Sequence, residues 1–90
     1  MEIKKTNVTE NFTLTGEADG LRFERPVSIQ NGVRNNHYTG RIIDADGQEV
    51  GAFIPGNTTI RDEYTDRAAA ILAAKAAFVE ASDAYLNVTE

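Results

Sequence analysis

Three turn-forming dipeptides divide the first half of the chain at nearly regular intervals: Asp19-Gly20, Asn31-Gly32 and Asp46-Gly47. Dipeptides of this kind adopt the positive φ angles that a two-residue hairpin turn needs at its central positions. Hairpins at this spacing predict an antiparallel four-stranded β-meander, with its strands over about residues 10–54.

The predicted strands alternate between apolar and polar residues, as in a sheet with one buried face. The first strand alternates Phe12 and Leu14 with Thr13 and Thr15. In the second strand, the apolar face carries Leu21, Phe23, Val27 and Ile29, and the polar face carries Arg22, Glu24, Ser28 and Gln30. The third strand is expected over His37–Asp44 and the fourth over Glu49–Ile54, after which Pro55-Gly56-Asn57 is expected to end the sheet.

Pro26 stands inside the second predicted strand. Because proline has no backbone N–H to donate to a neighbouring strand, it is normally confined to a sheet edge or a bulge. The meander makes this strand internal, so we expect a β-bulge at Arg25-Pro26.

Strong helix formers fill the chain from about residue 60 to residue 86. Thr59 is placed to cap the first turn, and a shorter helix beginning near Asp66 is the alternative. At about 100° per residue, bulky side chains that recur every seven residues form one stripe. The stripe comprises Tyr64, Ile71, Phe78 and Tyr85, with Leu72, Val79 and Leu86 beside them. Lys75 falls within it, and we expect its ammonium group to reach solvent past the sheet edge.

These patterns together predict an α+β fold in which one long C-terminal α-helix packs on one face of the sheet. A chain of 90 residues has room for one hydrophobic core, so residues 1–90 are expected to form a single domain. The expected core consists of Phe12, Leu14, Leu21, Phe23, Val27, Ile29, Ile42, Val50, Ile71, Leu72, Phe78 and Val79.

Charge and composition exclude several classes of protein. A net charge of −5 disfavours a protein that binds chiefly by neutralising phosphates, although nucleic-acid binding is not excluded. The absence of cysteine rules out disulfides and thiolate chemistry. No apolar stretch approaches the roughly 20 residues that span a bilayer, and the first ten residues lack the apolar run of a secretory signal. We therefore expect a cytoplasmic protein with no membrane partner.

The residues that could carry catalysis are scattered. His37 is the one histidine, and a desolvated Lys75 would be the other candidate for an enzyme, but no further catalytic group accompanies either. Asp44-Ala45-Asp46-Gly47 resembles the start of a calcium loop, but the ligands further along are missing, and a hairpin turn explains it. The sequence thus predicts a non-enzymatic protein with no catalytic residue, cofactor or metal site.

Positive charge gathers in the middle strands, where Arg22, Arg25, Arg34 and Arg41 are interleaved with His37 and Tyr38. Such a patch could hold an anion or an acidic partner. The segments Gly32-Val33-Arg34, Gly40-Arg41-Ile42 and Val50-Gly51-Ala52-Phe53, followed by an alanine-rich helix, resemble the three-strand-plus-helix pattern of AP2-type and integrase arm-type DNA-binding domains. The resemblance covers about half the chain, which has no tryptophan and an acidic net charge. The resemblance implies a sheet that lies in the major groove of DNA, with Arg34 and Arg41 contacting bases. The alternative function is therefore a nucleic-acid-binding β-sheet domain that uses Arg22, Arg34 and Arg41.

The leading hypothesis is a non-enzymatic protein-binding module, a small acidic inhibitor or adaptor of the type that phages and mobile elements encode. It would occlude a surface of a larger target that is basic or binds nucleic acid. Asp66, Glu80 and Asp83 on the helix would be further partner-binding residues. Small side chains on the helix face opposite the stripe would also allow a homodimer; they are Ala69, Ala73, Ala76, Ala77 and Ala84.

Overall fold

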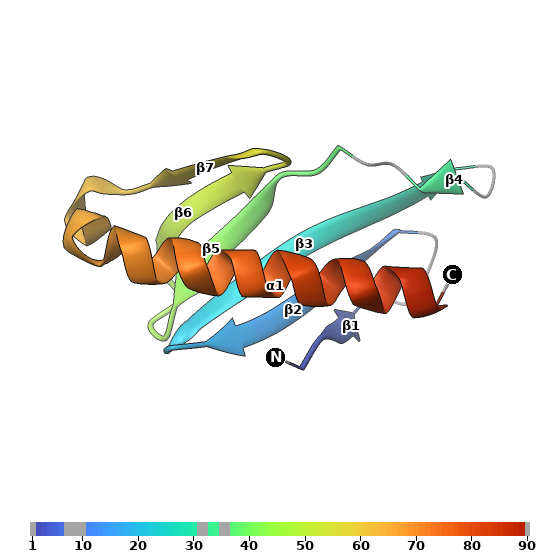
Figure 1. Ribbon diagram of the computed structural model, residues 1–90, viewed down its shortest axis with the longest axis horizontal. Helices are drawn as coiled ribbons and strands as arrows, with labels where there is room; N and C mark the ends of the chain where they lie inside the picture. Colours follow the sequence, from blue (N-terminus) through green and yellow to red (C-terminus); the bar gives the residue numbers. More distant parts are fainter. Residues whose placement is uncertain (1, 7–10, 31–32, 35–36, 90) are drawn as a thin grey trace.

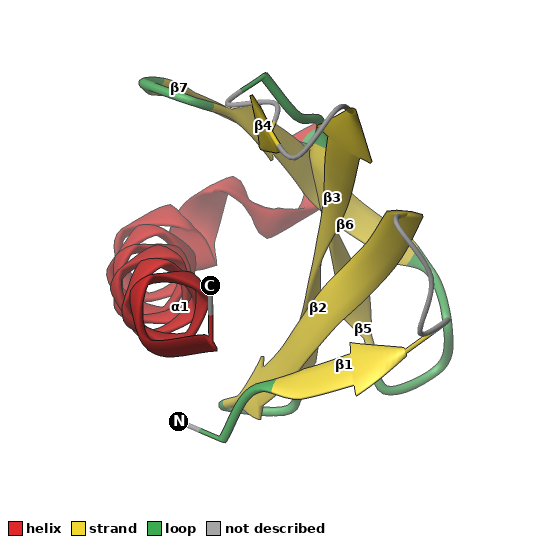
Figure 2. Ribbon diagram, turned by 90° about the vertical axis from the view of Figure 1, so that its right-hand side faces the viewer, coloured by secondary structure: helices red, strands yellow, loops and turns green. Residues whose placement is uncertain are grey.

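The computed structural model describes residues 2–6, 11–30, 33–34 and 37–89. It has an antiparallel sheet with a long C-terminal helix lying along one side, which confirms the predicted α+β class (Figures 1 and 2). The elements are β1 (Lys4–Thr6), β2 (Asn11–Ala18), β3 (Leu21–Gln30), β4 (Val33–Arg34), β5 (Gly40–Asp44), β6 (Glu49–Ile54), β7 (Asn57–Ile60), the 3₁₀ helix η1 (Asp62–Arg67) and the α-helix α1 (Ala68–Thr89).

The sheet is larger than the four predicted strands, which correspond to β2, β3, β5 and β6. Within the described residues it has seven strands, in the order β1-β2-β3-β5-β6-β7, with β4 paired to β3 off this path. The sequence pattern does not predict β7, because Pro55-Gly56-Asn57 is typical of a segment that ends a sheet. Instead Gly56, at φ 84°, forms a tight turn that returns the chain along β6. The third predicted strand is shorter than expected, since β5 begins at Gly40 and not at His37.

Two of the three predicted turns lie in the described residues, and both join antiparallel strands. Asp19 and Gly20 have φ of 55° and 75°, so this turn has the expected backbone. At Asp46-Gly47 only the glycine has a positive φ, of 85°, and the connection from Asp44 to Glu49 is longer than a two-residue turn. Asn31-Gly32 lies outside the described residues. Both hairpins are therefore confirmed, but the two-residue turn is confirmed only at Asp19-Gly20.

The bulge expected at Arg25-Pro26 is wrong. The β2–β3 register is continuous from Asn11↔Ser28 to Ala18↔Leu21. The register shift lies instead between Ile42 and Ile43, where β5 pairs with β6. Pro26 is tolerated because the β5 ladder on β3 ends at Glu24↔Arg41, so that at Pro26 the described ladders pair β3 only with β2.

The α-helix begins at Ala68, later than the predicted start at about residue 60 and close to the alternative start near Asp66. Thr59 does not cap it, because Thr59 lies in β7 opposite Ala52. The backbone N–H of Arg61 then donates to the carbonyl of Val50, at 2.9 Å, before the chain turns into η1. Since the sheet occupies residues up to Ile60, the α-helix can start only after this turn.

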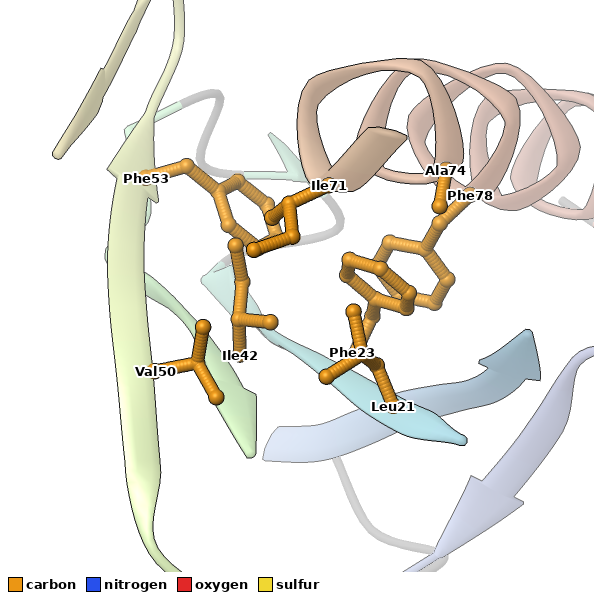
Figure 3. Close-up of a cluster of buried hydrophobic side chains, with 8 residues drawn as sticks. All are labelled: Leu21, Phe23, Ile42, Val50, Phe53, Ile71, Ala74 and Phe78. Carbon is orange, nitrogen blue, oxygen red and sulfur yellow. The ribbon is translucent and has the colours of Figure 1, made fainter. Parts of the chain in front are cut away.

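The core between α1 and the sheet consists of two apolar clusters. The main cluster comprises Leu21, Phe23, Ile42, Val50, Phe53, Ile71, Ala74 and Phe78 (Figure 3). The end cluster comprises Phe12, Leu14, Val27 and Leu86. In the main cluster, Phe78 stacks on Phe23 at a centroid distance of 5.5 Å and meets Phe53 edge-on at 6.2 Å. These aromatic contacts fix the middle of α1 on the sheet.

Three predicted core residues are less buried than expected. Leu72 is 43% exposed, and Ile29 and Val79 are only half-buried. The buried helix face runs instead through Ile71, Ala74, Phe78, Ser82 and Leu86. Leu72 is rotated about 100° from Ile71 around the helix axis. Because the buried face points to the sheet, Leu72 points away from it.

Two glycines are required by close packing and not by backbone angle. A Cβ at Gly40 would overlap the ring of Phe53, and a Cβ at Gly51 would overlap the carbonyl oxygen of Thr59. Phe53 can therefore fill the main cluster only because β5 begins with a residue that has no side chain.

Replacing Gly40 with alanine should lower the free energy of unfolding by about 1–3 kcal/mol, because the added methyl group forces the Phe53 ring out of place. Urea denaturation measures the loss. The matched control is Phe53→Leu, alone and combined with Gly40→Ala. Since leucine vacates part of the ring volume, the double variant should lose less than the sum of the single losses. Strictly additive losses would contradict the proposed overlap.

Candidate functional site

The outer face of the sheet, opposite α1, carries Arg22 and Arg41 beside acidic neighbours. Both are exposed and alternate with the buried Phe23 and Ile42. Arg22 Nη2 lies 3.6 Å from Glu24 Oε2, and Arg41 Nε lies 3.6 Å from Glu49 Oε1. Glu24 is also the cross-strand partner of Arg41. This face therefore has mixed charge and is not a positive patch.

The structure does not bring the three predicted arginines together. Arg34 lies in β4 opposite Ile29, whereas Arg22 lies near the other end of β3. At about 3.3 Å per residue, this separates Arg34 from Arg22 by roughly 20 Å. The segments that resemble AP2-type domains fall in β4, β5 and β6, but β4 pairs with β3 and the described strands do not form that three-stranded order.

His37 and Tyr38 lie in the connection that leads into β5. His37 is exposed and lines two open hollows, of about 360 and 490 Å³, whose described lining residues include no carboxylate, lysine or cysteine. Lys75 is half-buried, and its Nζ lies 5.8 Å from the centroid of the Phe53 ring. The hollows at His37 thus provide no acid–base partner of these types, and the ammonium group of Lys75 rests on an aromatic ring.

Asp44 organises the turn that resembles a calcium loop. Its Oδ1 accepts hydrogen bonds from the backbone N–H groups of Asp46 and Gln48, both at 2.9 Å, and its Oδ2 accepts one from the Tyr64 hydroxyl at 3.0 Å. The carboxylate therefore closes the hairpin and attaches η1 to it. The described residues contain no group of three or more side chains suited to hold a metal ion.

The outer face of α1 is exposed along its length and has few large side chains. The predicted alanines are all exposed: Ala69, Ala73, Ala76, Ala77 and Ala84. Leu72 lies at the margin of this alanine face. Glu80 is exposed on α1, and Asp66 is exposed in η1, before the helix begins. No ion pair involves Asp66 or Glu80 within the residues that the structure describes. The helix thus carries the predicted alanines and the free carboxylate of Glu80, and the carboxylate of Asp66 precedes its first turn.

Arg25, which was expected to belong to the positive patch of the middle strands, instead lies buried beneath this helix. Arg25 is 6% exposed, and its Nη1 donates to Ser82 Oγ at 2.9 Å and to Asp83 Oδ1 at 2.5 Å. Its guanidinium also lies over the Tyr38 ring, 4.4 Å from the centroid. Asp83, which we predicted to bind a partner, is thereby held by Arg25, although its side chain stays 52% exposed.

One sequence signal could have revealed Arg25. It falls between Phe23 and Val27 on the apolar face of the second predicted strand, so unbroken alternation buries it. The expected bulge at Arg25-Pro26 removed it from that pattern. Among the described atoms, Arg25 Nε has no hydrogen-bond partner. Ser82 Oγ, which accepts from Arg25 Nη1, also donates to the Val79 carbonyl at 2.9 Å.

Comparison with known proteins assigns no family. No protein-family model matches the chain, and no match is found among curated proteins or solved structures. In the described part of the chain, no helix combines the length and the apolar character that are needed to cross a bilayer. The surfaces of the molecule itself therefore provide the information about its function.

Replacing Arg25 with alanine should lower the free energy of unfolding by about 2–4 kcal/mol, because it leaves a cavity between the two apolar clusters and removes the contact with Tyr38. Chemical denaturation measures this loss. Ser82→Ala is the matched control and should cost about 1 kcal/mol, the value of one hydrogen bond. Equal losses in the two variants would contradict a packing role for the arginine side chain.

Stability should depend on pH through Asp44 and Tyr64. The Gln48 N–H, aided by the Tyr64 hydroxyl, holds the pKa of Asp44 below its ordinary value of 3.8, against the opposing effect of burial. A lowered pKa contributes stability above the unfolded value that is lost as pH falls through the folded pKa. The hydrogen bond to Asp44 raises the pKa of Tyr64 above 10.0, so the contribution of Tyr64 is lost as pH rises through that raised value.

Melting temperatures measured across the pH range test both effects. Relative to the wild type, Asp44→Asn should lose less stability below about pH 4, and Tyr64→Phe should lose less above about pH 10. Identical pH profiles for all three proteins would show that this hydrogen bond is not formed.

Proposed function

We propose that the protein is a non-enzymatic protein-binding module whose alanine face on α1 docks on a larger, basic target. The observation that carries this proposal is the exposed outer face of α1, where small side chains adjoin Leu72 and the free carboxylate of Glu80; the exposed carboxylate of Asp66 lies just before the helix, in η1. Alanine side chains let another backbone approach closely, and the carboxylates favour a partner of opposite charge.

The proposed mechanism is occlusion. A helix of 22 residues extends about 33 Å, a length suited to one side of a standard protein–protein interface. Opposite charge speeds encounter and sets orientation, while the apolar surface contributes most of the affinity. The module would act in the cytoplasm as an inhibitor or adaptor of the kind that phages and mobile elements encode, and its target would be a basic or nucleic-acid-binding protein.

The geometry favours the helix over the sheet as the binding surface. On the outer face of the sheet, Arg22 and Arg41 are paired with Glu24 and Glu49, and Arg34 lies away from both. A nucleic-acid-binding sheet would instead need positive charges gathered on one surface. The alternative function is therefore less well supported by the arrangement of these side chains.

Affinity capture from cells of the source organism tests the proposal with three baits. They are the wild type, the helix variant Ala73→Glu with Ala77→Glu, and a control, Ala45→Glu with Thr59→Glu, which adds the same charge at exposed positions away from α1. A basic protein recovered by the wild type and the control should fall at least tenfold with the helix variant, because two glutamates block close approach. Binding of the purified target should weaken as salt rises from about 50 to 300 mM.

Three results would contradict the proposal. They are capture that survives the helix variant but fails with the control, affinity that does not change with salt, and low-salt DNA binding that is lost when Arg34 and Arg41 are both changed to alanine. Sedimentation of the same baits separates a target from a second copy. A wild-type dimer that the helix variant converts to a monomer would identify the alanine face as a homodimer contact.

A further inference from the structure

A polar row crosses the interface between α1 and the sheet and separates the two apolar clusters. On β3, Arg25 lies between Phe23 of the main cluster and Val27 of the end cluster. On α1, Ser82 lies one turn after Phe78 and one turn before Leu86. Arg25 and Ser82 are the buried polar residues of the described chain, and Arg25 Nη1 donates to Ser82 Oγ.

The main cluster and the end cluster, which lie on the two sides of this row, bury different numbers of α1 side chains. The main cluster contains Ile71, Ala74 and Phe78 from the helix, whereas Leu86 is the fully buried helix residue of the end cluster, with Tyr85 packed beside it. Ile3 is the partly buried side chain that packs against both clusters. Because apolar stabilisation grows with the area buried, the last turns of α1 are held less firmly than its middle.

The polar row also costs less to open than an apolar contact of the same size. When α1 is closed, Arg25 Nε is buried with no hydrogen-bond partner in the described structure. Opening would hydrate this N–H and the carboxylate of Asp83, which is already half exposed. Ser82 would keep its hydrogen bond to the Val79 carbonyl, because both groups lie on the helix.

We propose that the C-terminal part of α1, from Ser82 to Asn87, opens from the sheet as one unit while the main cluster stays packed. Arg25 marks the sheet side of the boundary at which this unit separates, because its polar contact costs less to open than an apolar one, and Asp83 is its partner on the helix. Opening uncovers the apolar face of Phe12, Leu14 and Val27. The inference concerns the inner face of α1 and does not depend on the function proposed for its outer face.

Native-state hydrogen exchange of the full chain tests the proposal, under conditions in which exchange reports the opening equilibrium. In the wild type, the amides of Ser82–Asn87 should exchange at least about tenfold faster than those of Ile71–Phe78. They should share one opening free energy with a weak dependence on denaturant. The amides of Ile71–Phe78 should show the strong dependence of global unfolding.

Two variants distinguish an opening unit from a uniformly loosened helix. Leu86 is detached in both the open and the unfolded state, so Leu86→Ala should accelerate exchange in both segments by the same factor, at least about thirtyfold. Ile71 is detached only on global unfolding, so Ile71→Val should accelerate exchange of Ile71–Phe78 about three- to tenfold and leave Ser82–Asn87 within twofold of the wild type.

A third variant distinguishes opening at the polar contact of Arg25 from ordinary fraying of the helix end. Arg25→Met replaces the guanidinium with an apolar side chain that joins the two clusters, and it should slow exchange of Ser82–Asn87 at least about threefold. A smooth gradient of rates from Asn87 inward, unaffected by Arg25→Met, would mean fraying alone and overturn the proposal. Equal acceleration of both segments by Ile71→Val would also overturn it, because α1 would then open only as a whole.

Discussion

The match between β3 and α1 is the contact on which the rest of the fold depends. Alternation along β3 points Leu21, Phe23, Arg25 and Val27 to the side that α1 covers. Each two-residue step on β3 meets a four-residue step on α1: Phe23 stacks on Phe78, Arg25 bonds Ser82, and Val27 shares a cluster with Leu86. Two strand residues rise about 6.6 Å and four helix residues about 6.0 Å, so the steps nearly coincide where the elements run in the same general direction (Figure 1).

Much of this arrangement could be predicted from the sequence, because the residues that specify it are large or conformationally special. Asp19-Gly20 and Asp46-Gly47 define hairpins, and alternation on β3 correctly divides Leu21 and Phe23 from their polar neighbours. The helix face was placed imperfectly because Ala74 and Ser82, which belong to it, have small side chains and are not part of the bulky stripe. Leu72 could then be assigned to the core with equal justification, and only the packing against the sheet turns it outward.

The candidate surfaces show a second limit of periodicity. Sequence spacing put Arg22, Arg34 and Arg41 in neighbouring strands, but charge on a sheet depends on cross-strand partners that spacing does not reveal. Glu24 and Glu49 lie beside two of these arginines, and the third falls on a short strand at the far end of β3. The alanines of α1 were easier to predict as one exposed face, since local spacing places them on the same side of the helix. The burial of Arg25 escapes prediction for a different reason, because the bulge expected at Pro26 interrupts an alternation that is in fact continuous.

The pairing of strand steps with helix steps also limits how the length of this molecule can change. A single residue inserted into α1 after Phe78 would rotate Leu86 by about 100° and carry it off the end cluster. Two residues added to β3 before Val27 would shift Val27 by one row, that is, by one two-residue step along the strand. A longer version of this architecture must therefore grow by whole rows, with two residues in each paired strand for every four in the helix. Length variation of any other size is tolerated only in the connecting turns.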